Sequence, residues 1–220
     1  MSKFRGILIT LIIFFFIFSL RIPCINQSPY EQGERWRQSD TESIARNFIE
    51  HKFNIFYPQF NYDGPMPNYV QLEFQITTYL IAILYKFFGY KYVLARIVPI
   101  SFFMGSCVFL YLIARRYYSI EQSRIALLLY GIFPINIFFS RAIMPESSAL
   151  FFYLGAFYFF SRWIDNTEVK SILLSSIFTA LAISQKIPTI FIGIPMLAMA
   201  LQKYKIKIFK VWELYCFGII

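Results

Sequence analysis

Apolar segments alternate with short polar clusters along the whole sequence, and this alternation constrains the fold more than any single motif does. Hydrophobic residues make up 58% of the 220 residues and charged residues only 15%, whereas a soluble domain carries roughly 25% charged residues. A helix needs about 20 mainly apolar residues to cross a bilayer, and several segments approach that length. The sequence therefore predicts an all-α fold, a polytopic transmembrane helical bundle.

The net charge of +9 is explained by where the basic residues lie. Lys and Arg gather at the ends of apolar segments, as the positive-inside rule expects for cytoplasmic loops. They do not form the compact basic stretch that is typical of a nucleic-acid-binding protein. We therefore expect membrane lipid and no nucleic acid as a partner, and a multi-pass position in the cell (inner) membrane.

The first span is expected over residues 4–20, with a cytoplasmic N-terminus because Lys3 and Arg5 flank it. A signal peptide would look similar at its start, but no small-residue cleavage site follows. The polar stretch that comes next is too long for a tight turn. We assign residues 21–91 to an extracytoplasmic loop, and loops of this length are usually functional.

The charges decide how the middle of the chain is threaded. Residues 76–89 are apolar but short, and a second crossing there would put Arg115 and Arg116 outside. We therefore expect this segment to be a surface helix on the outer face. The following spans are expected at residues 92–114, 124–139 and 147–163.

Residues 171–201 are too long for one span, because a helix of this length measures about 46 Å against about 30 Å of hydrocarbon. The sequence around Lys186 and Pro188 interrupts the segment. Placing the lysines after residue 202 in the cytoplasm requires two short spans, with a hairpin at Lys186 on the outer face. The last spans are then 171–185, 188–202 and a partial 211–220.

This threading gives about six spans plus the start of a seventh. Since the last apolar segment stops at Ile220, we expect residues 1–220 to be a single module, truncated from the N-terminal portion of a longer protein.

The threading also collects unusual polar residues on the outer face. Arg141 and Lys186 stand there against the positive-inside trend, and charged groups near a membrane often mark a site. For Lys186, snorkelling at the interface is an equally good explanation. The other members of this outer set are the 36–42 cluster, the 63–67 turn that begins at Asp63, Glu73 and the 140–146 turn that ends at Glu146.

The segment Ser39-Asp40-Thr41-Glu42 has the form of a capping box, with Ser39 as the cap and Glu42 three residues later. A short amphipathic surface helix is expected from there to about His51. Asp40 would lie in its first turn, where the helix dipole favours the ionised carboxylate. Taken alone, an acid at this position more often serves the helix than catalysis.

The order of these features resembles a known family. A first span, an acid before a surface helix, a second surface helix, an arginine-and-acid turn and a lysine at the end of a span follow one another. This order is similar to that of the polyprenyl-phosphate-sugar-dependent glycosyltransferases of GT-C fold. They include the dolichyl-phosphate-mannose–protein mannosyltransferases and the lipid A aminoarabinose transferases. The resemblance covers essentially the whole chain.

The resemblance implies roles for particular residues. Asp40 matches the acid that acts as catalytic acid-base residue, although Ser39 and Thr41 stand where some members have a second acid. Glu146 ends a turn that often ends in Asp in the family. Lys186 matches a lysine that meets the lipid phosphate, in a segment similar to the family's Thr-Lys-Gly/Pro pattern.

The chemistry of the residues fits this assignment. A carboxylate at Asp40 could take the proton from an acceptor hydroxyl or amine. Arg141 and Lys186 could bind the anionic lipid phosphate, with Glu146 and Glu73 as further substrate-binding candidates. No cofactor is evident. A divalent metal held by Asp40 and Glu146 stays open, because nothing in the spacing demands one.

The main hypothesis is a hexosyl- or pentosyl-transferring membrane glycosyltransferase. It would move a sugar from a polyprenyl-phosphate donor to a protein, lipid or glycan acceptor on the extracytoplasmic face. The alternative is a non-enzymatic protein, such as a lipid-linked-sugar flippase component or a transporter, which would place charges at mid-membrane depth. A third reading is that the truncated chain is inactive by itself.

Overall fold

The computed structural model describes residues 2–30, 34–61, 65, 67–70 and 73–219. Every regular element in these ranges is a helix, so the expected all-α class is confirmed; Gln59 and Tyr69 form one isolated antiparallel bridge. Most of the 63–67 turn, including Asp63, lies outside the described residues. In chain order the helices are α1 (Ser2–Ser19), α2 (Arg35–Glu50), α3 (Ile76–Phe88), α4 (Tyr92–Tyr117), α5 (Ile120–Ile132), α6 (Pro134–Phe139), α7 (Glu146–Asn166), α8 (Val169–Gln185), the 3-10 helix η1 (Ile187–Ile192), α9 (Gly193–Tyr204), the 3-10 helix η2 (Lys205–Lys210) and α10 (Trp212–Ile219).

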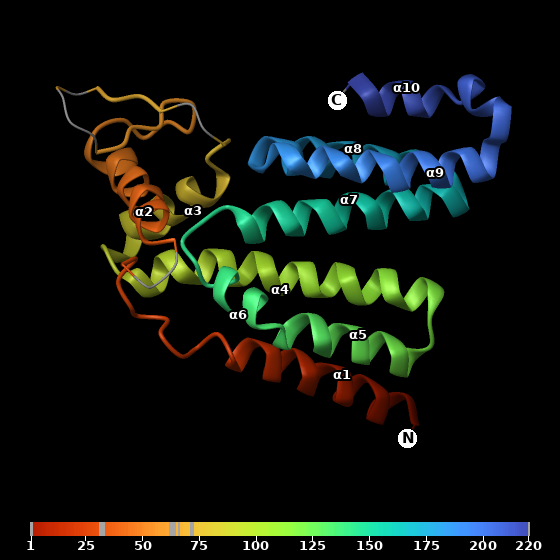
Figure 1. The fold of residues 1–220 in the computed structure, drawn as a ribbon, viewed down its shortest axis with the longest axis horizontal. Coiled ribbons are helices and arrows are strands. Elements are labelled where there is room, and N and C mark those ends of the chain that lie inside the picture. Colours follow the sequence, from red (N-terminus) through yellow and green to blue (C-terminus); the bar gives the residue numbers. More distant parts are fainter. Residues whose placement is uncertain (1, 31–33, 62–64, 66, 71–72, 220) are drawn as a thin grey trace.

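The long helices lie side by side in a bundle, with α7 packed between α4 and α8 and with α1 and α5 on the far side of α4 (Figure 1). The helices α2 and α3 form a separate group at one end, called here the α2–α3 end. The N-terminus and the α4–α5 turn lie at the opposite end, called here the basic end because Lys3, Arg5, Arg115 and Arg116 are there.

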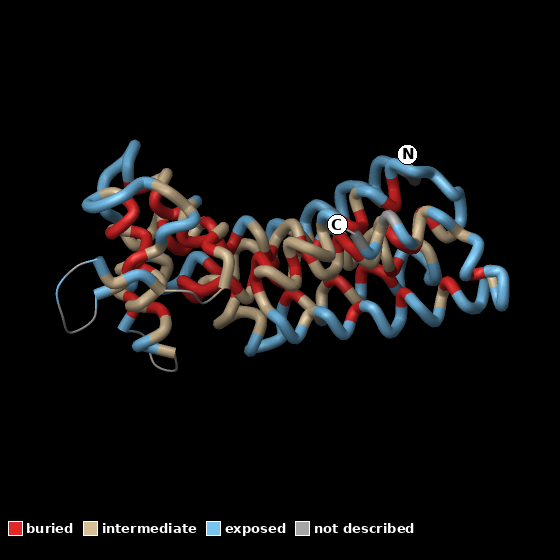
Figure 2. Tube along the Cα trace, turned by 90° about the horizontal axis from the view of Figure 1, so that it is seen from above, coloured by how far each residue is buried: buried red, intermediate tan, exposed pale blue. Residues whose placement is uncertain are grey.

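Buried residues follow the lines where helices face each other, and exposed residues run along the outer sides of the bundle (Figure 2). Many of these outer residues are large and apolar. On α1, for example, Phe4 is 76% and Phe15 72% exposed. A soluble protein rarely leaves such a continuous apolar surface in water, whereas a lipid environment accommodates it.

Two helical segments in the described ranges are long and apolar enough to cross a membrane, Tyr92–Tyr117 and Ile187–Lys210. Other apolar helices are shorter, among them α3 and α8. The count of about six spans therefore remains a prediction.

The helix expected over residues 124–139 is divided in the structure. Helix α5 ends at Ile132, Phe133 is extended, and Pro134 begins α6. The residue before a proline is sterically pushed out of the helical region, which explains the break. The fully buried Arg21 holds the divided segment, because its guanidinium donates to the Gly131 carbonyl (2.8 Å) and to Ser140 Oγ (2.9 Å).

The capping-box prediction for α2 is wrong. The helix begins at Arg35, four residues before Ser39, whose hydroxyl donates to the Arg35 carbonyl within the helix. Asp40 consequently lies in the second turn, where the helix dipole no longer explains its charge state. The apolar face is as expected: Ala45 and Phe48 are buried against α3.

Near the α2–α3 end of the bundle, α8 stops at Gln185 and the chain reverses at Lys186. Helix α9 then runs back toward the basic end and packs against α7 (Figure 1). This reversal brings Lys186 to the same end of the bundle as α2 and α3.

Candidate functional site

A pocket of about 190 Å³ opens at the α2–α3 end. Helix α2 forms one wall and the chain leading into α3 forms the other. Of the expected site residues, Asp40 and Glu73 both line it. The remaining lining residues are Trp36, Arg37, Thr41, Ile44, Phe74, Gln75, Thr77, Thr78, Pro145 and Gln185.

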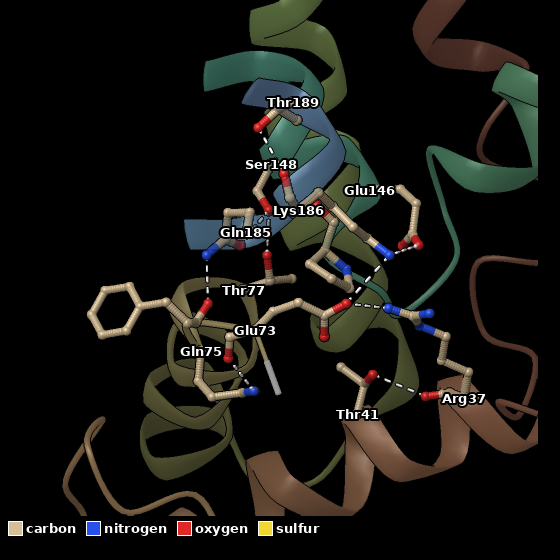
Figure 3. A network of polar contacts seen from close by, with 12 residues as sticks. Arg37, Thr41, Glu73, Gln75, Thr77, Glu146, Ser148, Gln185, Lys186 and Thr189 are labelled. Carbon is tan, nitrogen blue, oxygen red and sulfur yellow. Dashed lines mark hydrogen bonds and ion pairs between the residues drawn. The ribbon is translucent and has the colours of Figure 1, made fainter. Parts of the chain in front are cut away.

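Charged side chains meet at the edge of this pocket. Lys186 Nζ lies 2.8 Å from Glu146 Oε1 and 3.3 Å from Glu73 Oε1, and Arg37 forms an ion pair with the same Glu73 oxygen. Figure 3 shows the four side chains converging from α2, the chain before α3, the start of α7 and the end of α8. Each is about a quarter exposed, between 23% and 29%. The structure thus brings together Lys186, Glu146 and Glu73, which are far apart in the sequence.

Arg37 was not singled out from the sequence as a site residue. Its position three residues before Asp40 puts both side chains on one face of a helix. The spacing was therefore a usable signal, but it required the correct start of α2, which the capping-box prediction had placed too late.

Asp40 differs from the other acids of the pocket. It is half-buried, and its carboxylate makes no ion pair or hydrogen bond with another side chain in the part of the chain that the structure describes. Burial raises the pKa of Asp40 above its usual value, because a low-dielectric surrounding disfavours the charged form. An unpaired carboxylate with a raised pKa is well suited to accept a proton.

Arg141 lies apart from this pocket. Its guanidinium donates to the Pro23 carbonyl (2.7 Å), and its own carbonyl accepts a hydrogen bond from the buried Arg96 (2.9 Å). Arg96 also donates to the carbonyls of Gln27 and Ser28. These contacts join the chain after α1 to the turn before α7.

No group of three or more His, Cys, Asp or Glu side chains that could hold a metal ion occurs among the described residues. Glu146, one of the two ligands considered from the sequence, directs Oε1 to Lys186. Glu146 is thus part of the ion-pair network at the edge of the pocket.

Residues 76–220, more than half of the chain, match the family model described as dolichyl-phosphate-mannose-protein mannosyltransferase. The chain belongs to this family. No curated protein and no solved structure matches it. The resemblance inferred from the order of features is thereby confirmed, and the protein is a membrane glycosyltransferase of GT-C type. Membership of this mannosyltransferase family does not favour the flippase or transporter alternative.

The match to the mannosyltransferase family covers Glu146 and Lys186 but begins after Arg37, Asp40 and Glu73. Among the residues that line the pocket, the match covers Thr77, Thr78, Pro145 and Gln185. The lining residues before Ile76 are joined to the matched part by the ion pair of Glu73 with Lys186 and by the packing of α2 on α3.

Proposed function

We propose that this mannosyltransferase-family protein transfers a sugar from a polyprenyl-phosphate donor to an acceptor on the extracytoplasmic face. One observation carries the proposal. The unpaired Asp40 carboxylate lines the same pocket as Glu73, whose carboxylate holds the two cations Arg37 and Lys186. A base and a paired set of cations are what transfer from a phosphate-linked sugar requires.

Asp40 acts as the general base in this proposal. The acceptor heteroatom gives its proton to the Asp40 carboxylate and forms a bond to the anomeric carbon of the sugar. The bond between that carbon and the phosphate oxygen breaks, and polyprenyl phosphate leaves with the electron pair. General-base help of this kind contributes about 10²–10⁴-fold to the rate.

Lys186 and Arg37 bind the phosphate that leaves. An ammonium group has three N–H donors and a guanidinium has five. Lys186 directs its ammonium to Glu73 and Glu146, and Arg37 pairs with Glu73 through one terminal nitrogen. Donors therefore remain on both cations for the charge that develops on the departing phosphate. The proposal assigns this role to Arg37 in preference to Arg141, because Arg37 lines the pocket.

An apolar groove of about 540 Å³ lies beside the pocket, between α3, α4 and α7. Its walls begin on α3 at Leu80, one turn or less after the pocket residues Thr77 and Thr78, and Ser101 is the polar residue among them. We assign this groove to the first isoprene units of the donor, since burial of apolar chain surface is favourable at roughly 25 cal/mol per Å².

The orientation follows from charge. The basic end carries Lys3, Arg5, Arg115 and Arg116, and the lysines of η2 follow α9. The positive-inside rule places that end in the cytoplasm, so the α2–α3 end would face outward in a multi-pass cell (inner) membrane protein. The family description supports a hexose as the sugar and a protein as the acceptor, while a pentose, or a lipid or glycan acceptor, would use the same machinery.

The donor class can be tested with the full chain in lipid nanodiscs. We expect release of polyprenyl phosphate from polyprenyl-phosphate mannose when acceptor-containing membranes are added, and no consumption of a nucleotide-linked mannose. Use of the nucleotide sugar in place of the lipid-linked one would overturn the donor assignment.

The face can be tested with a natural thiol. Cys24 is exposed and follows α1 at the α2–α3 end. A membrane-impermeant maleimide applied to intact cells should label the protein, and Cys24→Ser should remove that label. Labelling of Cys24 only after the membrane is opened would place the site on the cytoplasmic face.

A further inference from the structure

A buried polar cluster lies directly beside the ion pairs of the pocket. Its members are Gln185 at the end of α8, Ser148 in the first turn of α7 and Thr77 in the first turn of α3. All three are buried, with exposures of 0%, 0% and 2%. We call them the Gln185 cluster.

Gln185 uses both ends of its amide. Its Oε1 accepts a hydrogen bond from Ser148 Oγ (2.8 Å), and its Nε2 donates to the Phe74 carbonyl. The Ser148 hydroxyl also lies 2.8 Å from Thr77 Oγ1. A backbone bond from the Phe74 nitrogen to the Ser184 carbonyl (2.9 Å) joins the same segments. Figure 3 shows this set next to the charged side chains.

Gln185 and its two hydrogen-bond partners each lie within two residues, in sequence, of a charged residue at the pocket. Gln185 precedes Lys186, Phe74 follows Glu73, and Ser148 comes two residues after Glu146. One side chain therefore ties together the three backbone segments that carry Lys186 and its two carboxylate partners. No charged atom of the pocket takes part in these hydrogen bonds, so the tie is separate from the ion pairs themselves.

We infer that Gln185 is a positioning residue for Lys186, an inference that rests on the proposed role of Lys186 at the donor phosphate. A lysine side chain is long and rotamer-rich, and fixing its backbone lowers the ordering cost of each contact that it makes. Glutamine suits the task because it is at once acceptor and donor. Methionine has similar length but offers neither bond, so Gln185→Met removes the tie while keeping the volume.

A purely structural role for Gln185 in helix packing is the competing explanation, and the same helix pair offers a matched control. Ser175 on α8 is fully buried and donates to the Ala156 carbonyl of α7 (2.9 Å), ten residues before Gln185. Ser175→Ala removes a buried contact between the same two helices away from the pocket.

The experiment compares Gln185→Met, Lys186→Met and their double variant in the full chain in nanodiscs, with polyprenyl-phosphate mannose as the donor. We expect Gln185→Met to lower kcat/KM for the donor by about 10- to 100-fold, the range that follows from a misplaced binding group. The double variant should be no worse than Lys186→Met, because Gln185 acts through that lysine. Ser175→Ala should keep the donor kcat/KM within about twofold of the wild type, since distant sites behave independently.

Effects of the two substitutions that multiply would overturn the inference, because Gln185 would then act independently of Lys186. If Gln185→Met fails to fold, Ser148→Ala removes the hydroxyl that contacts Gln185 Oε1 and Thr77 Oγ1 and leaves the bond from Gln185 to the Phe74 carbonyl. It is combined with Lys186→Met in the same way. Normal turnover by Lys186→Met refutes the proposed function, whereas reduced turnover with multiplying effects refutes only the role of Gln185.

Discussion

Replacing Lys186 by methionine tests whether this cation binds the donor phosphate. The substitution keeps the length of the side chain and removes its charge. Arg37 still pairs with Glu73, but Glu146 loses its ion-pair partner among the described residues. The variant should therefore lose both phosphate binding and part of the local order of the pocket.

The size of the effect follows from the contact that is lost. A hydrogen bond to a charged group is worth about 1.5–3 kcal/mol. With about 1.36 kcal/mol for each factor of ten in rate, kcat/KM for the donor should fall by about 10- to 150-fold. The lysine side chain is 23% exposed, and since solvent weakens its contacts, the lower half of this range is the better expectation.

The assay is release of polyprenyl phosphate from polyprenyl-phosphate mannose by the full chain in nanodiscs. Lys86→Met is the matched control, because Lys86 is an exposed lysine at the same end of the bundle but lies outside the pocket. Adding Glu146→Gln to Lys186→Met should restore the melting temperature toward that of the wild type without restoring activity. Turnover of Lys186→Met within twofold of the Lys86→Met control would refute the assignment.

Asp40 must be ionised to act as the base, and burial raises its pKa. The pKa that governs the acidic side of the kcat/KM-against-pH profile should therefore lie above about 3.9, the pKa of an exposed Asp. An apparent pKa at or below about 3.9 would contradict this prediction. Because the pKa of Asp40 is raised in the folded state, ionisation of Asp40 opposes folding. At pH 7 the Asp40→Asn variant should therefore melt at or above the wild-type temperature, and the difference should vanish as the pH falls below the pKa of Asp40 in the unfolded state. A lower melting temperature of the variant at pH 7 would show that the carboxylate stabilises the fold. Arg21→Met leaves the Gly131 carbonyl and Ser140 without their buried donor. Since each buried polar group left unsatisfied costs about 1–3 kcal/mol, the variant should lose about 2–6 kcal/mol, measured by thermal unfolding in detergent with Arg115→Met as a control; a loss under 1 kcal/mol would contradict this role.

Charge and length were the sequence features that predicted the fold. The positive-inside rule placed Lys186 at a chain reversal, and the structure reverses there. The division of the segment at Pro134 was equally readable from local sterics, yet hydropathy alone joined α5 to α6. The start of α2 could not be read from Ser39, because a capping box is a local preference, whereas residues before Ser39 make tertiary contacts. Arg37 pairs with Glu73, and the buried Gln38 accepts a hydrogen bond from the Ile143 backbone N–H.

For the site, the sequence identified residue types but not their partners. Asp40 was selected because it matches the acid before the family's first surface helix, and Lys186 because it stands on the outer face against the positive-inside trend. Glu73 and Glu146 were selected as acids of the same outer set. Their meeting depends on contacts between elements more than 30 residues apart. Gln185 gave no signal of its own, since a buried glutamine is recognised only by the backbone carbonyl and hydroxyl that it reaches.

The most direct test of the central claim compares Asp40→Asn with Glu50→Gln, a neutralised acid on the same helix outside the pocket. Both variants should be folded and inserted, and both should be assayed with polyprenyl-phosphate mannose under one set of conditions. We predict that Glu50→Gln transfers sugar at the wild-type rate and that Asp40→Asn loses at least about 100-fold in rate. Equal rates for the two variants would contradict the claim that Asp40 is the base of this enzyme.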